Sequence, residues 1–228
     1  MNGRSTLDRL DELIAERSIL LHPFYVAWQK GALTREQLAR YATIYHPHVA
    51  AFPRYLSTAA TRTEDPVVRS ELERNLADEL SVPKAHEELW LDFAEELGVD
   101  RAGLKDAAPH PAARQIVDAF DRLAASGDAN AMAALYAYES QQPEVSREKA
   151  GGLRGLYGVD NPRALAYFDV HAEVDIEHRA GERKVIQWCL DAGADPDALL
   201  SAADQALTAY WGLLDGVCAD AGIENRPH

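Results

Sequence analysis

The sequence predicts an all-α protein, a single domain of seven or eight helices that spans residues 1–228. Apolar residues recur at spacings of three and four along most of the chain, which is the period of an amphipathic helix. Capping residues and glycines mark where these segments begin and end. No segment alternates polar and apolar residues as a half-buried strand would. With 228 residues, 47% of them hydrophobic, the chain is long enough for one buried core.

Start signals place the helices in order. Thr34 opens a capping box in which its hydroxyl and the Gln37 side chain satisfy each other's free backbone donors. Asp65, Asn161 and Asp195 each precede a proline, a pairing typical of a first helical turn. The predicted helices span 5–17, 19–30, 35–60, 66–97 with a break near Pro83, 111–126, 129–149, 162–191 and 196–221.

Prolines and glycines divide these segments further. We expect Pro47 and Pro53 to kink or divide the helix that starts after Thr34, because proline removes a backbone donor. Glycines are common just past helix ends, where a left-handed residue is needed. The glycines at predicted helix ends are Gly31, Gly98, Gly127, Gly151-Gly152, Gly193 and Gly222.

Charge and cysteine content exclude several classes of function. The formal charge is −14, from 37 acidic and 23 basic residues, which disfavours nucleic acid and anionic membrane surfaces as partners. No apolar run approaches the ~20 residues of a membrane span, and the first thirty residues lack a signal-peptide pattern. Cys189 and Cys218 are too few for a disulfide framework. We therefore expect a cytoplasmic protein.

The segment after Asn161 carries the strongest chemical signal. His171, Asp175 and His178 lie at i, i+4 and i+7, so their side chains leave a helix within about 40° of one another. The same face includes Phe168, which should point inward. A charged group facing a core needs a partner or a metal. The pattern therefore indicates either metal ligands or two core-edge histidines oriented by an aspartate.

Further ligands are available on other helices. Asp175-x-x-His178 is a shorter-acid form of the Glu-x-x-His step used in di-iron bundles. Glu79 and His86 lie two turns apart on one face, and Glu139 follows an apolar stretch. Taken singly, Glu79 with His86 indicates surface positions more than ligands, and Glu139 alone is a weaker signal still. Together with the first three they form a set of three carboxylates and three imidazoles, which suits two Fe(II) or Mn(II) ions.

This order of residues, Glu-x6-His, then Glu, then His-x3-Asp-x2-His, resembles the haem-oxygenase-like di-iron oxidases, and within them the CADD-like para-aminobenzoate synthases. The resemblance covers about His22 to His178 and implies a fold shared with TenA thiaminases and the PqqC quinone-cofactor oxidases. It implies two iron ions, or an iron and a manganese, with O2 as co-substrate and an external reductant. The metal ligands that it implies are Glu79, His86, Glu139, His171, Asp175 and His178.

The resemblance also implies a substrate. CADD-like proteins are implicated in making para-aminobenzoate for folate, with carbon from one of their own tyrosines and nitrogen from one of their lysines. The corresponding residues here are Tyr25, Tyr41 and Lys149. Each has a purely structural alternative. The tyrosines fit core packing, with Tyr45 as an alternative to Tyr41, and Lys149 fits a solvated charge at a helix end.

Other functions remain open at this stage. The same metal pair could act on an external amino acid or fatty acid, by C–C cleavage or N-oxygenation. A metal-free TenA-like enzyme is disfavoured, because the two cysteines lie outside any recognisable site. A PqqC-like enzyme is disfavoured because it would not need this acid-rich ligand set. A protein-interaction module has no supporting feature. We expect the protein to form a homodimer. His46 and His48 should lie near the ligands or at the core edge. Arg179 or Glu182 is expected to orient His178 by a hydrogen bond.

Overall fold

The computed structural model describes residues 5–81 and 84–224, and all regular secondary structure within them is helical. None of the helices described is long and apolar enough to cross a membrane. The elements are α1 (Thr6–Glu16), the 3-10 turn η1 (Ile19–Leu21), α2 (Pro23–Gln29), α3 (Arg35–Arg62), α4 (Pro66–Ser81), α5 (His86–Glu96), α6 (Arg101–Asp106), α7 (Pro111–Ala124), α8 (Asp128–Glu139), α9 (Gln142–Leu156), α10 (Pro162–Asp191) and α11 (Pro196–Ala221).

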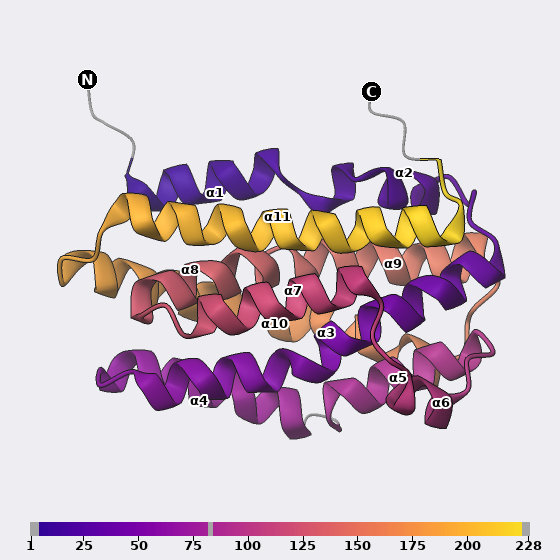
Figure 1. The fold of residues 1–228 in the computed structure, drawn as a ribbon, viewed down its shortest axis with the longest axis horizontal. Coiled ribbons are helices and arrows are strands. Elements are labelled where there is room, and N and C mark those ends of the chain that lie inside the picture. The colour runs from indigo at the N-terminus through magenta and orange to yellow at the C-terminus, as the bar shows by residue number, and fades with distance from the viewer. Residues whose placement is uncertain (1–4, 82–83, 225–228) are drawn as a thin grey trace.

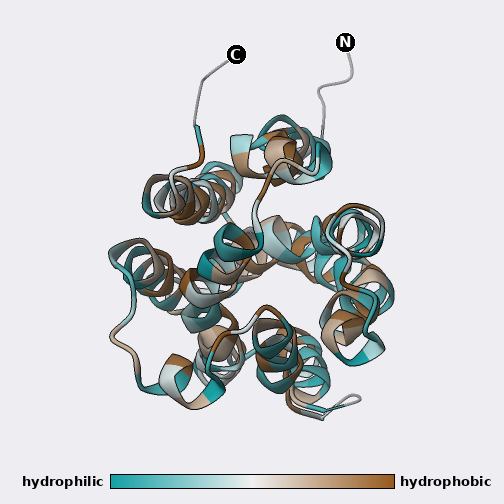
Figure 2. Ribbon diagram, turned by 90° about the vertical axis from the view of Figure 1, so that its right-hand side faces the viewer, coloured by the Kyte–Doolittle hydropathy of each residue, from teal (hydrophilic) through white to brown (hydrophobic). Residues whose placement is uncertain are grey.

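The long helices run side by side along the longest axis of the molecule (Figure 1). Helix α11 packs on α7, α8 and α1, while α10 packs on α4, α5, α8 and α9. Seen along their axes, most helices show both hydrophilic and hydrophobic residues, as expected when each buries one face (Figure 2). Because α10 contacts these four helices and also α1, its side chains meet residues from distant parts of the sequence.

The capping signals are confirmed. Thr34 and Gln37 form both hydrogen bonds of the capping box at the start of α3. The side chains of Asn161 and Asp195 cap α10 and α11. Of the two outcomes expected for Pro47 and Pro53, a kink or a division, division is wrong, since α3 continues unbroken from Arg35 to Arg62 with both prolines inside it. The break expected near Pro83 falls between α4 and α5, although Pro83 itself lies outside the described residues.

The prediction of one helix over 129–149 is wrong, because two helices cover this segment and the second extends past residue 149. Helix α8 ends at Glu139 and α9 begins at Gln142. Gly151 and Gly152 do not end α9, which continues to Leu156. The reason lies in packing, because a Cβ added to Gly152 would stand 2.5 Å from the indole Nε1 of Trp28. Glycine here allows close approach of a buried tryptophan and has no role in terminating the helix. The short helix α6 was also not predicted; the side chain of Asp100 caps it.

Two adjacent alanine substitutions test this packing. We expect Gly152→Ala to destabilise the protein by about 1–3 kcal/mol, because its methyl group overlaps the rigid Trp28 ring. Gly151→Ala, which meets nothing within 4 Å, should stabilise it by about 0.5–1 kcal/mol through helix propensity. Urea unfolding of both variants measures the difference. Equal stabilities would contradict the packing role.

Candidate metal centre

Helix α10 supplies His171, Asp175 and His178 to the centre of the bundle, and three other helices supply the remaining predicted ligands. Glu79 comes from α4, His86 from the first turn of α5 and Glu139 from the last turn of α8. All six side chains are buried, with residue exposures of 6% or less. The structure therefore brings together every residue of the predicted ligand set.

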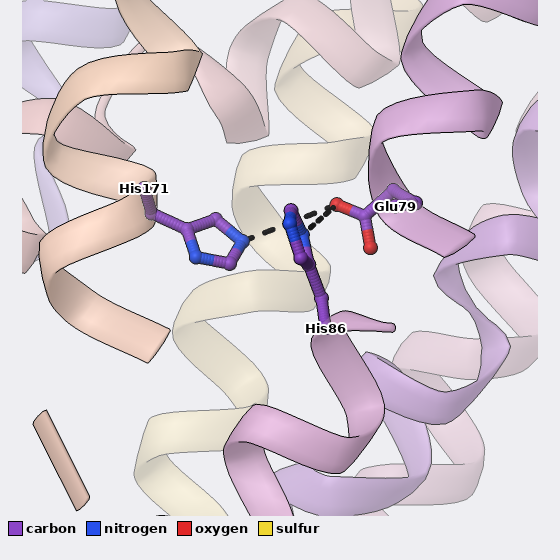
Figure 3. Close-up of side chains that lie close together, drawn as sticks. All are labelled: Glu79, His86 and His171. Carbon is purple, nitrogen blue, oxygen red and sulfur yellow. Dashed lines mark ion pairs between the residues drawn. The ribbon is translucent and has the colours of Figure 1, made fainter. Parts of the chain in front are cut away.

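The six residues form two triads. The first is Glu79, His86 and His171, and the second is Glu139, Asp175 and His178; in each, one ligand atom per residue lies within 4.8 Å of the others. In the first triad, Glu79 Oε1 is 2.9 Å from His86 Nδ1 and 3.9 Å from His171 Nε2. Figure 3 shows both imidazoles directed at this carboxylate. In the second, His178 Nδ1 is 3.2 Å from Asp175 Oδ1 and 3.6 Å from Glu139 Oε2.

Outer hydrogen bonds fix which ring nitrogen faces each triad. The Nδ1–H group of His171 donates to the Tyr167 carbonyl at 2.6 Å, so its Nε2 is free to face Glu79. His178 donates from Nε2 to Asp78 Oδ2 at 3.0 Å, so its Nδ1 faces the second triad. Such partners orient metal-bound histidines and set their tautomers.

Sequence reasoning missed two of these outer partners. Asp78 was passed over in a polar stretch, and its only signal was its place beside Glu79. Asn75, one helical turn before Glu79, donates from Nδ2 to both oxygens of Glu139, at 3.0 and 2.8 Å. The expectation that Arg179 orients His178 is wrong, because its guanidinium donates to the Ser140 carbonyl and to Glu144.

Electrostatics favour cations at this place. Burial raises the pKa of Glu139 to about 8, with the charge of His178 opposing the shift and that of Asp175 adding to it. Burial also raises the pKa of Asp175 to about 6. Burial lowers the pKa of His171 well below its usual value, which keeps the ring neutral, as a ligand must be. Burial lowers the pKa of His178, but the carboxylates of Asp175, Glu139 and Asp78 outweigh it and raise this pKa to about 10, so a bound cation would displace a proton from the ring. Buried carboxylates and imidazoles are the donors that divalent iron or manganese accepts, so the residues fit a metal pair.

A second cluster surrounds Lys149. Tyr25, Tyr41 and Lys149 are at most 1% exposed, and Lys149 Nζ lies 5.4 Å from the ring centroid of Tyr25 and 5.3 Å from that of Tyr41. Tyr45 is as close, at 5.2 Å, and so remains an alternative to Tyr41. Burial lowers the pKa of Lys149 to about 7. The reading of Lys149 as a solvated charge at a helix end is therefore wrong, since α9 runs past it and the amine is enclosed by aromatic rings.

Aromatic contacts connect the two clusters. The Tyr167 ring lies over His171, with centroids 4.1 Å apart, and meets the Trp90 ring edge-on at 4.8 Å. Trp90 in turn contacts Tyr41 at 5.7 Å. Sequence analysis identified neither Tyr167 nor Trp90, because each lies in a helical apolar pattern that indicates only core packing.

Two further histidines that the sequence analysis considered, His46 and His48, lie outside both triads. His46 is buried and bonds to Glu87 at 3.1 Å. Burial lowers the pKa of His48 to about 3, and aromatic rings such as Phe120 surround it. Both are core groups.

The fold and the paired triads place the chain in a known class of protein. Residues 39–211 match the family described as iron-containing redox enzyme, and the chain belongs to this haem-oxygenase-like family of enzymes. It is 41% identical to the 4-aminobenzoate synthase of Chlamydia trachomatis over 211 residues, 92% of this chain and 90% of that one. It is 37% identical to the 4-aminobenzoate synthase of Nitrosomonas europaea over 232 residues, 96% of this chain and 94% of that one.

Solved structures confirm the fold. A TenA homologue from Pseudomonas syringae superposes with a TM-score of 0.79 at 20% identity, covering 93% of this chain and 92% of that one. A CADD-like protein of unknown function from Nostoc punctiforme superposes with a TM-score of 0.77 at 20% identity, covering 96% and 97%. The predicted all-α, TenA/PqqC-like architecture is confirmed.

The hydrogen bond from His178 to Asp78 predicts a measurable loss of metal affinity. Asp78→Asn keeps an acceptor but removes the charge that supports the imidazole, so we expect Mn(II) to bind about 10–100-fold more weakly at one of two sites. Equilibrium dialysis with metal analysis measures both affinities. Glu73→Gln, an exposed change on the same helix, is the control. Unchanged affinity in Asp78→Asn would show that this contact does not support a ligand.

The buried amine predicts a pH-dependent stability. The pKa of Lys149 falls from 10.5 to about 7 on folding, so the unfolded chain binds more protons between these values and the stability of the protein rises with pH across this range. Lys149→Met should therefore stabilise the protein most at and below pH 7, on the order of a few kcal/mol, and progressively less as pH approaches about 10. Urea unfolding at both ends of the range tests this, with exposed Lys184→Met as the control. A gain independent of pH would contradict the assignment.

Proposed function

We propose that this protein is an O2-dependent di-metal oxidase that forms 4-aminobenzoate from one of its own tyrosines, with Lys149 as the amino donor. The observation that carries the proposal is the enclosure of the Lys149 amine by the rings of Tyr25 and Tyr41. A packed core has no structural use for an unpaired amine at this position. The relatives named 4-aminobenzoate synthase, which align along nearly the whole chain, support the same product.

Two redox-active ions, Fe/Fe or Fe/Mn, would be held by the two triads and would supply oxidation by O2, with electrons from an external reductant. Glu79, Glu139 and Asp175 offset the charge of the ions. The imidazoles of His171 and His178 are held in the required tautomers by the Tyr167 carbonyl and Asp78.

The chain's own residues prepare the nitrogen for reaction. Lys149 pairs with no carboxylate among the described residues, and its pKa of about 7 leaves much of the amine neutral near neutral pH. A neutral amine has the lone pair needed to attack a carbon of an oxidised aromatic ring. Tyr25 and Tyr41 are fully buried, so bulk water is kept from competing at the ring. The product would carry off atoms of the protein, so each chain would act about once.

Two other functions would use the same fold. The same metal pair could oxidise an external amino acid or fatty acid; a relative named 4-chloro-allylglycine synthase is 28% identical over 75% of this chain. A metal-free, TenA-like hydrolase would need a reactive thiol. Burial raises the pKa of both Cys189 and Cys218 to about 11, which disfavours the thiolate.

Isotope labelling tests the proposed substrate. Protein grown with ring-labelled tyrosine and ε-15N-lysine should release doubly labelled 4-aminobenzoate when given Fe(II), a reductant and O2 without any aromatic substrate. The mass of the protein should fall correspondingly. Lys149→Met should abolish the nitrogen label, and Tyr25→Phe or Tyr41→Phe should abolish product if that ring is consumed.

Tyr55→Phe is the matched control, because Tyr55 is equally buried but lies beside His48 and Phe120, away from the Lys149 cluster. Two ions bound per chain without labelled product would refute the tyrosine-derived substrate and favour an external one.

A further inference from the structure

Glu182 occupies a core position on the face of α10 that carries the predicted ligands. It follows His171, Asp175 and His178 at i+11, one turn past the last of them, so it points in the same direction. Its exposure is 1%. The next buried positions along this face are apolar, beginning with Val185. Helix packing alone would favour an apolar residue at position 182, so the carboxyl needs another explanation.

No group described in the structure compensates this carboxyl. No amide, hydroxyl or basic group among the described residues hydrogen-bonds to either of its oxygens. The charges that act most strongly on it are those of other carboxyls, Glu139, Asp175 and Glu71. The flanking guanidiniums on α10 are engaged elsewhere, Arg179 with Glu144 and Arg183 with Asp11.

The contact between Glu182 and Glu139 is itself informative. Two carboxylates offer only acceptors, so they can lie together only if they share a proton or a cation. Asn75 already donates to both oxygens of Glu139 and has no second donor group. A cation held by Glu139 would therefore relieve Glu182 as well.

Charge counting points the same way. The three carboxylates of the predicted ligand set leave one positive charge in excess when two divalent cations bind beside three neutral imidazoles. Glu182 supplies a fourth negative charge, which makes the buried centre neutral. Di-iron sites in other helical bundles likewise use four carboxylates. A neutral buried site avoids the large cost of unbalanced charge in a low dielectric.

We propose that Glu182 is a further protein ligand of the ion held by Glu139, Asp175 and His178. The inference rests on the metal pair of the proposed function. The Glu182 oxygens lie outside the 4.8 Å spacing of that triad, so ligation requires rotation of the Glu182 or Glu139 side chain. The competing possibility is a protonated Glu182 that only positions Glu139 by a hydrogen bond.

Anaerobic titration of the full-length protein with Co(II) separates these possibilities, because it needs no turnover. Bound ions are counted by metal analysis, and the visible absorption of Co(II) reports coordination number, since lower-coordinate Co(II) absorbs more strongly. Glu182→Gln preserves size and can still hydrogen-bond to Glu139, but it removes the anionic ligand. Glu173→Gln, exposed on the same helix, is the matched control. Thermal unfolding of each apo variant establishes that it folds.

We expect Glu182→Gln to weaken the binding of one of the two Co(II) ions by tenfold or more and to increase the visible absorption of that ion. The affinity and spectrum of the other ion should not change. His86→Ala weakens metal binding at the first triad, so the ion bound by this variant is the one held by Glu139, Asp175 and His178. Adding Glu182→Gln to His86→Ala should lower the affinity for that ion. Parent-like affinity and spectrum in Glu182→Gln would overturn the inference while leaving the metal pair intact. A parent protein that binds fewer than two ions would overturn both.

Discussion

Buried negative charge is the constraint on which the arrangement of this bundle depends. Glu79, Glu139 and Asp175 come from three helices that are distant in sequence, and all three carboxylates lie in the interior. Carboxylates removed from water are strongly unfavourable unless hydrogen bonds or cations compensate them. Asn75 and the imidazolium form of His178 compensate part of this charge, and metal ions would displace that proton. The core is therefore organised around a place where cations belong.

Helix α10 connects the buried carboxylates to the rest of the fold through its packing contacts. Its 30 residues contact α4, α5, α8 and α9 along one buried face. His171 belongs to the first triad, and Phe168, one turn earlier, lies 5.5 Å from the Lys149 amine. A shift of α10 along its axis would therefore displace both clusters together. This explains why one long, uninterrupted helix with a firm Asn161 cap serves both sites.

Local sequence signals correctly predicted the features that are determined within one helix. The i, i+4, i+7 pattern identified the face of α10 because helical geometry alone determines which side chains share a face. The resemblance to a known family then identified the ligands on other helices. Tertiary packing decided the rest. The burial of Lys149 was not predictable from Gly151-Gly152, because only the Trp28 ring on another helix explains the glycine at position 152, where the helix continues. Asp78 and Asn75 looked like ordinary polar residues until their contacts with α10 and α8 were visible.

The two clusters are also coupled electrostatically. The charge of Lys149 acts on His171, so a positive amine and a cation bound beside His171 would oppose each other across the Tyr167 and Phe168 layer. Like charges disfavour each other's charged form, and the interaction is strong where little water screens it. Cations bound at the triads would therefore lower the pKa of Lys149 further and favour the neutral amine. Burial alone already lowers the pKa of Lys149 to about 7. This burial costs stability, which the aromatic packing around the amine must offset. Because the proposed reaction needs the neutral amine as a nucleophile, occupancy of the metal centre and readiness of the nitrogen would rise together.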